Sequence, residues 1–142
     1  MKQKKKKIFF TFLMVLTLSL STFNSYAAVK DDSAQPITVN QCVISFTAIS
    51  STSARAHVYG RSSNGVEFIK SKITLQSAPK GSSSYSNVSG VDPEIYTVYD
   101  SLTINHLCTF PITSSKNYRI KVELTDKVNG KQYTVTKYQA LT

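Results

Sequence analysis

Hydrophobic and polar residues alternate along most of the chain after residue 36, with the period of two that is typical of β-strands. The alternation predicts strands over residues 37–49, 54–60 and 66–76, each with one apolar side. Segments rich in Ser, Asn and Gly separate these runs and have the composition of turns. The residues expected to face the core are Cys42, Ile44, Phe46, Ala48, Ala54, Ala56, Val58, Gly60, Ile69, Ile73 and Leu75.

Two further segments precede the last part of the chain. Residues 77–90 are rich in Ser and Gly, which predicts a mobile loop with a short edge strand at residues 85–88. Residues 96–110 alternate again and predict one long strand that ends at Pro111, with Asp100 as a misfit on its apolar side. The residues on that side are Val98, Leu102, Ile104, His106 and Cys108.

The last alternating stretch predicts a β-hairpin. Asn129-Gly130 is a strong turn signal, because both residues tolerate a positive φ. With this pair as the loop, Leu124 lies opposite Val135 and Val122 lies opposite Lys137, which places a lysine on the core side. We expect a bulge after Val135 that turns the next residues the other way and brings Tyr138 and Ala140 inward. The inward residues of the first strand are Tyr118, Ile120, Val122 and Leu124.

About seven strands with no amphipathic helix predict one all-β domain over residues 37–142, built as an antiparallel β-sandwich. A small barrel is the main alternative. Residues 1–27 form a lysine-rich start, an apolar run and a small-residue cleavage site after Ala27, which predicts a helical secretory signal peptide. The alternative is an uncleaved anchor, although the apolar run is short for one. Residues 28–36 form a polar lead-in, and we expect a secreted protein that associates loosely with the cell envelope.

Removal of the signal peptide changes the charge of the protein. The whole chain carries 17 Lys+Arg and 8 Asp+Glu, a net charge of +9. Five of the cations and none of the acids lie within residues 1–27, so 12 cations and 8 acids leave a charge of +4. This modest charge does not indicate a nucleic-acid partner. Cys42 and Cys108 are the two cysteines, and export to an oxidising compartment predicts a disulfide between them, with two buried free thiols as the alternative.

The second half of the domain resembles immunoglobulin-like and fibronectin type III-like domains. The residues that carry the resemblance are Leu107, Tyr118, Ile120, Val122, Asn129 and Gly130. The resemblance implies that Tyr118 forms the corner hydrogen bond of such sandwiches. Taken whole, the chain is similar to small secreted proteins of Gram-positive bacteria, which implies a fold and a location and no activity.

Few residues offer catalytic chemistry. His106 and Cys108 share a strand face, but zinc would also need Cys42 and His57, and we expect no metal site and no cofactor. The carboxylates Asp92, Glu94 and Asp100 are the candidates for a hydrolase, and a Pro turn before a strand explains them more simply. We therefore expect a protein that is not an enzyme.

Half of the cations outside the signal peptide lie in the final hairpin. They are candidates for contact with an anionic envelope polymer, a glycan or a surface protein, or they keep an exposed strand soluble. We expect a non-catalytic interaction module. The alternatives are a small hydrolase, an enzyme inhibitor that acts through residues 78–90, and an antagonistic toxin. The six cations are Lys116, Arg119, Lys121, Lys127, Lys131 and Lys137.

Overall fold

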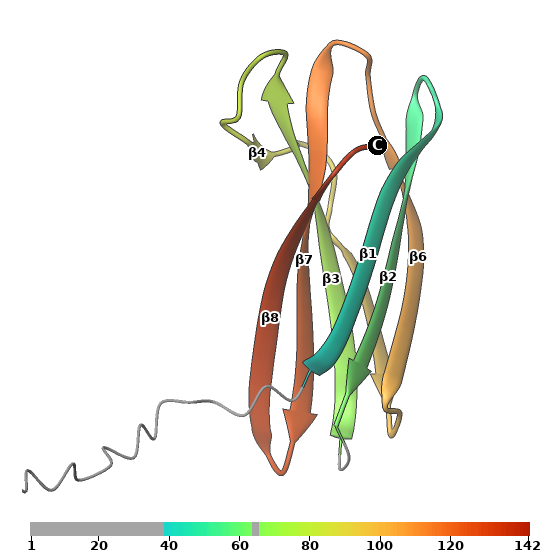
Figure 1. Ribbon diagram of the computed structural model, residues 1–142, viewed down its shortest axis with the longest axis vertical. Helices are drawn as coiled ribbons and strands as arrows, with labels where there is room; N and C mark the ends of the chain where they lie inside the picture. The colour runs from blue at the N-terminus through green and yellow to red at the C-terminus, as the bar shows by residue number, and fades with distance from the viewer. Residues whose placement is uncertain (1–38, 64–65) are drawn as a thin grey trace, which may run out of the picture. The chain divides into compact units, whose positions relative to one another are not determined.

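Residues 39–63 and 66–142 are described by a computed structural model (Figure 1). The expected signal peptide and lead-in lie outside these residues. The described part of the chain contains strands and no helix, so the all-β prediction is confirmed. The strands are β1 (Val39–Ser50), β2 (Ser53–Ser62), β3 (Val66–Pro79), β4 (Ser86–Asn87), β5 (Glu94–Tyr99), β6 (Thr103–Pro111), β7 (Lys116–Val128) and β8 (Lys131–Ala140).

The strands form two antiparallel sheets. The smaller sheet has the order β1-β2-β6. In the larger sheet β3 is central, with β7 and then β8 on one side and both β4 and β5 on the other. The two sheets pack face to face in the manner of a β-sandwich (Figure 1).

The core lies between the sheets and follows the predicted alternation. Phe46 of β1 and Phe110 of β6 pack edge to face, with ring centroids 6.4 Å apart, and both are buried. Ile73 and Val122 of the larger sheet complete the same cluster. Ala48 departs from the prediction and is exposed, because the register of β1 shifts beside it as the strand reaches its end.

The prediction of one long strand over residues 96–110 is wrong. The run breaks after β5 at Asp100, which has a positive φ of 51°. The two halves join different sheets, since β5 pairs with β3 and β6 pairs with β2. An Asp tolerates the left-handed conformation better than most residues. Asp100, which interrupts the apolar side of the run, therefore forms the turn between β5 and β6.

The short edge strand predicted at residues 85–88 is confirmed as β4, which pairs with Gln76 and Ser77 of β3. This pairing attaches the Ser-rich loop to the edge of the larger sheet. The first residues of that predicted loop, Ser77 to Pro79, belong to β3 instead.

The final hairpin has the predicted turn and no bulge. Asn129 and Gly130 have φ values of 51° and 76°, and the two strands pair without a register shift from Val128 and Lys131 onward. The expected bulge after Val135 is therefore wrong, and Tyr138 lies on the outer face, where it is 53% exposed. The continuous register keeps Lys137 opposite Val122 on the inner side.

Lys137 fits this position because it lies at the open edge between the sheets. Its Nζ donates a hydrogen bond of 3.1 Å to the backbone carbonyl of Cys42 in β1. Further along, the Ala48 N–H donates to the Thr142 carbonyl and the Thr142 N–H donates to the Phe46 carbonyl. The last residues thus connect the larger sheet to the edge of the smaller one, as Figure 1 shows near the C-terminus.

The expected disulfide between Cys42 and Cys108 is absent, and both cysteines are free thiols. Cys42 lies opposite Gly60 of β2, whereas Cys108 lies opposite Ala56 on the other side of the same strand. They are separated by two strand spacings, about 10 Å, and by four residues along the strands, about 13 Å. A disulfide requires Cα atoms within about 7 Å, so the register prevents it.

Candidate functional site

Arg119 lies between two aromatic rings on the outer face of the larger sheet. Its guanidinium carbon is 4.3 Å from the ring centroid of Tyr85 and 4.4 Å from that of Tyr138. Tyr85 precedes β4 and Tyr138 belongs to β8, so the three side chains come from both sides of β7. A cation stacked on aromatic faces is attracted by the ring quadrupoles and is held in a defined orientation.

Hydrogen bonds also hold the side chain of Arg119 in place. Its Nε donates to Oε1 of Gln76 over 2.8 Å, and Nε2 of Gln76 donates to Oδ1 of Asn87 over 2.9 Å. Within residues 39–63 and 66–142 the two terminal amino groups of Arg119 make no hydrogen bond or ion pair. The strands therefore orient a guanidinium whose terminal donors remain available.

A pocket of about 270 Å³ adjoins this stack. Tyr85 lines it and also contacts Arg119, and Ala140, another lining residue, is the cross-strand partner of Arg119. Two lysines line the pocket and no carboxylate side chain does. Its lining residues are Lys80, Tyr85, Lys116, Asn117, Tyr118, Ala140 and Leu141.

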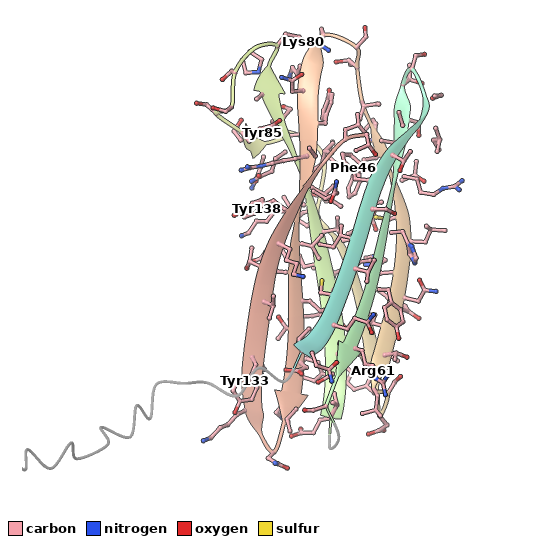
Figure 2. All side chains as sticks on the ribbon, viewed as in Figure 1. Phe46, Arg61, Lys80, Tyr85, Tyr133 and Tyr138 are labelled. Atoms are coloured by element: carbon pink, nitrogen blue, oxygen red, sulfur yellow. The ribbon has the colours of Figure 1, made fainter. Side chains whose placement is uncertain are left out.

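These groups form one cationic and aromatic area at one end of the domain. Figure 2 shows Lys80, Tyr85 and Tyr138 along the same side of the upper half of the molecule. Together with Arg119 and Lys116 they define what we call the Arg119 surface. Lys80, Lys116 and Tyr85 line the pocket, and Arg119 and Tyr138 lie beside it, because Arg119 contacts both Tyr85 and Tyr138.

The other cations predicted for the hairpin do not join this surface. Nζ of Lys121 lies 3.1 Å from a carboxylate oxygen of Glu123, and Lys127 pairs with Glu67 over 2.8 Å. The Glu67 pKa is lowered by the hydrogen bond from Lys127 and then by that from the backbone N–H of Gly130. Both lysines are thus balanced by carboxylates on the outer face.

The two lysines of β8 also lie apart from it. Lys137 is on the inner side and bonds to the Cys42 carbonyl, while Lys131 is exposed beside the turn, opposite Val128. The six cations that the sequence places in one row therefore lie in five separate environments. The structure brings Lys116 and Arg119 together and disperses the rest.

A second basic face was not identified from the sequence. Arg55, His57 and Arg61 alternate along β2 and point away from the core of the smaller sheet. Nε2 of His57 lies 2.6 Å from Oδ1 of Asn105. A shallow pocket of about 440 Å³ lies here, lined by Ser45, Arg55, His57, Asn105 and Leu107. The sequence signal for this face is Arg55, His57 and Arg61. They lie on one side of the strand because two and four positions separate them.

The chemistry of His106 and Cys108 works against a catalytic dyad. His106 is buried, its Nδ1 lies 3.2 Å from Oγ of Ser71, and its ring packs on Tyr96. Burial lowers the pKa of His106, with Glu94 opposing. Burial raises the Cys108 pKa to about 12. A reactive cysteine needs a lowered thiol pKa, so both shifts favour the neutral pair.

Glu94 and Asp100 are too far apart to act as a carboxylate pair. Glu94 begins β5 and Asp100 follows its end. Six residues of extended strand separate them by about 20 Å, which is more than twice the spacing that glycoside hydrolysis uses. Asp92 is exposed in the segment before β5.

The described residues contain no group of three His, Cys, Asp or Glu side chains that is able to hold a metal ion. They also contain no helix with the length and hydropathy to cross a membrane. Comparisons with known proteins give no match to a family model, a curated protein or a solved structure. The candidate function therefore depends on the chemistry of the Arg119 surface.

Proposed function

We propose that the protein is a non-catalytic interaction module that binds an acidic glycan through the Arg119 surface. The observation that carries the proposal is the guanidinium of Arg119, held between Tyr85 and Tyr138 beside a pocket that two lysines line. An exported protein meets such polymers at the cell envelope. The signal-peptide pattern of residues 1–27 supports that location.

The chemistry of the surface suits a chain of sugars with regularly spaced anionic groups. The terminal amino groups of Arg119 form a planar fork that matches a carboxylate or a phosphate. Lys80 and Lys116 add charge at the pocket without a fixed direction. Tyr138 is half exposed and offers an apolar ring face for a sugar.

We also propose that the fold is of the immunoglobulin-like or fibronectin type III-like type. In such sandwiches the first, second and fifth core strands form one sheet, and the third, sixth and seventh form the other. The sheet β1-β2-β6 and the order β3-β7-β8 correspond to these two groups. Tyr118, near the start of β7, contacts the backbone five residues upstream, as the tyrosine corner does.

The test is the binding of polymers that differ in charge. Polygalacturonate carries carboxylates, poly(glycerol phosphate) carries phosphates, and dextran of similar length is neutral. We expect binding to at least one anionic polymer and none to dextran, with an affinity that falls as salt rises. Calorimetry or fluorescence titration gives the dissociation constants.

Variants assign the binding to the surface. Arg119→Lys keeps the charge and loses the planar fork and the stacking, so we expect about tenfold weaker binding. Lys127→Ala is the matched control, because Lys127 lies on the same strand and face but pairs with Glu67. Equal binding by Arg119→Lys and the wild type, or binding to dextran, would overturn the proposal.

A further inference from the structure

Strand β5 is an open edge of the larger sheet. It pairs with β3 on one side and with no strand on the other within the described residues. Ile95, Tyr96 and Tyr99 are 59%, 47% and 71% exposed, and Glu94–Tyr99 contains no Lys, Arg or Pro. Proteins usually protect such edges, because an unpaired, apolar strand is a template for another strand.

The edges on the opposite side of the domain are protected. The edge of β1 has two register shifts and receives the bonds of Lys137 and Thr142. The edge strand β8 carries Lys131 and Lys137. The lack of any comparable device on β5 sets this strand apart from them.

The backbone of β5 shows which groups face the open side. The Asp100 N–H donates to the Glu67 carbonyl over 3.2 Å, which continues the register of the β3–β5 ladder. In an antiparallel ladder alternate residues exchange bonds with one neighbouring strand. Val98 and Tyr96 therefore bond to β3, and Ile95, Thr97 and Tyr99 direct their N–H and C=O groups outward.

We propose that β5 pairs with β5 of a second copy of this chain, antiparallel and centred on Thr97. In this register Thr97 meets Thr97 of the partner and Ile95 meets Tyr99, and these three residues exchange about six backbone hydrogen bonds. The same register places Tyr96 opposite Val98 on the inner side. Aromatic residues opposite β-branched ones are among the favourable cross-strand pairs.

Self-complementarity is the reason to choose a second copy as the partner. A twofold axis perpendicular to the sheet pairs β5 with itself and keeps the outer faces of both larger sheets on the same side. A register centred on Tyr96 would pair Ile95 with Thr97 but would place Tyr99 opposite Pro93, which lies before β5 and has no N–H. The register centred on Thr97 is favoured because it forms more backbone hydrogen bonds.

The pairing adds to the proposed function but does not depend on it. It places the Arg119 surfaces of two copies on one face of a continuous sheet. A polymer that spans both surfaces then binds with an avidity greater than that of a single site. The oligomeric state is measured without any glycan, so failure of one proposal leaves the other distinguishable.

Sedimentation velocity of the purified protein over a wide range of concentration tests the pairing. We expect a monomer–dimer equilibrium. Thr97→Pro removes an N–H that faces the open edge and leaves the bonds to β3, so we expect a folded monomer. Ile95→Lys places a charge at an exposed position of the new interface, and we expect it also to be monomeric.

Two controls place the same lysine on other edges. Thr136→Lys alters the exposed outer face of β8, and Thr109→Lys alters β6, the neighbouring edge of the smaller sheet. We expect both to dimerise like the wild type. Circular dichroism and cooperative unfolding confirm that each variant is folded. A wild type that stays monomeric, a folded Ile95→Lys that still dimerises, or loss of the dimer in Thr109→Lys would overturn the proposal.

Discussion

The hydroxyl oxygen of Tyr118 lies 3.1 Å from the backbone nitrogen of Thr113 and accepts its hydrogen bond. The same hydroxyl is 3.2 Å from Oγ1 of Thr113. The ring of Tyr118 is buried in the core, so one side chain connects the β6–β7 turn to the centre of the domain. The polar end of this tyrosine satisfies a backbone donor that strand pairing leaves free.

Tyr118→Phe should therefore lower the free energy of unfolding by about 1–2 kcal/mol, because the Thr113 N–H loses its acceptor. Urea unfolding followed by fluorescence or circular dichroism measures the change. Tyr138→Phe is the matched control, since its hydroxyl has no hydrogen bond among the described residues. Equal stability of Tyr118→Phe and the wild type would contradict the assigned role.

Lys137 should contribute to stability and not to glycan binding. Lys137→Ala removes the hydrogen bond to the Cys42 carbonyl and should cost about 1 kcal/mol. Its affinity for an anionic polymer should equal that of the wild type, because the side chain lies on the inner side of β8. Lys131→Ala removes the same charge beside the turn and should leave the stability unchanged. A binding defect in Lys137→Ala alone would contradict this division of roles.

His106 should destabilise the domain in mild acid. Burial holds its pKa below the ordinary value of 6.5, against the opposing effect of Glu94. As the pH falls below 6.5 the unfolded chain takes up the proton first, so the free energy of unfolding decreases. This loss should be smaller in His106→Gln. Urea unfolding at a series of pH values compares the slopes, and identical slopes for the two proteins would exclude His106 as their source.

The two thiols should be present and slow to react. With a pKa of about 12 in place of 9.0, Cys108 carries about a thousandfold less thiolate at pH 8. Burial also raises the Cys42 pKa, although the charge of Lys137 opposes it. A chromogenic thiol reagent should react slowly with the native protein and rapidly with two thiols after unfolding. Fewer than two thiols in the unreduced, unfolded protein would reveal a bridge.

Gly60 should not tolerate a side chain. It lies in β2, where a methyl group would overlap Cδ2 of Leu124 and approach within 3.0 Å of Cγ2 of Ile104. Gly60→Ala should lower the free energy of unfolding by about 1–3 kcal/mol through overpacking. Leu124→Ala in the same chain should remove this penalty, so the double mutant should be more stable than the sum of the single effects predicts.

Local signals predicted the hairpin, and non-local pairing limited the rest. Asn129 and Gly130 fix the β7–β8 turn as predicted, but the expected bulge after Val135 was wrong, because the hydrogen bond that accommodates Lys137 opposite Val122 is made to Cys42, far along the chain. Residues 96–110 alternate continuously, and their division between two sheets depends on partners far along the chain. The expected disulfide between Cys42 and Cys108 was wrong for the same reason. The two cysteines lie opposite residues of β2 that are four positions apart, and the sequence alone does not show this offset.

The Arg119 surface was predicted in part. Lys116 and Arg119 were identified from the charge of the hairpin, but their aromatic partners were not. The expected bulge would have turned Tyr138 inward, away from Arg119, and Tyr85 reaches Arg119 through the pairing of β4 with β3. A two-residue strand within a Ser-rich segment gives too weak a pattern to place that ring.

The two backbone hydrogen bonds between Thr142 and β1 give the domain a mechanical property. β1 begins at the lower end of the molecule and the C-terminus lies at the upper end (Figure 1). A pull between these points runs along the strands, while the bonds of Thr142 to Phe46 and Ala48 run across them. Both bonds are then loaded in shear at the same time. The contact between Thr142 and β1 should therefore withstand stretching along the strands better than peeling from one end.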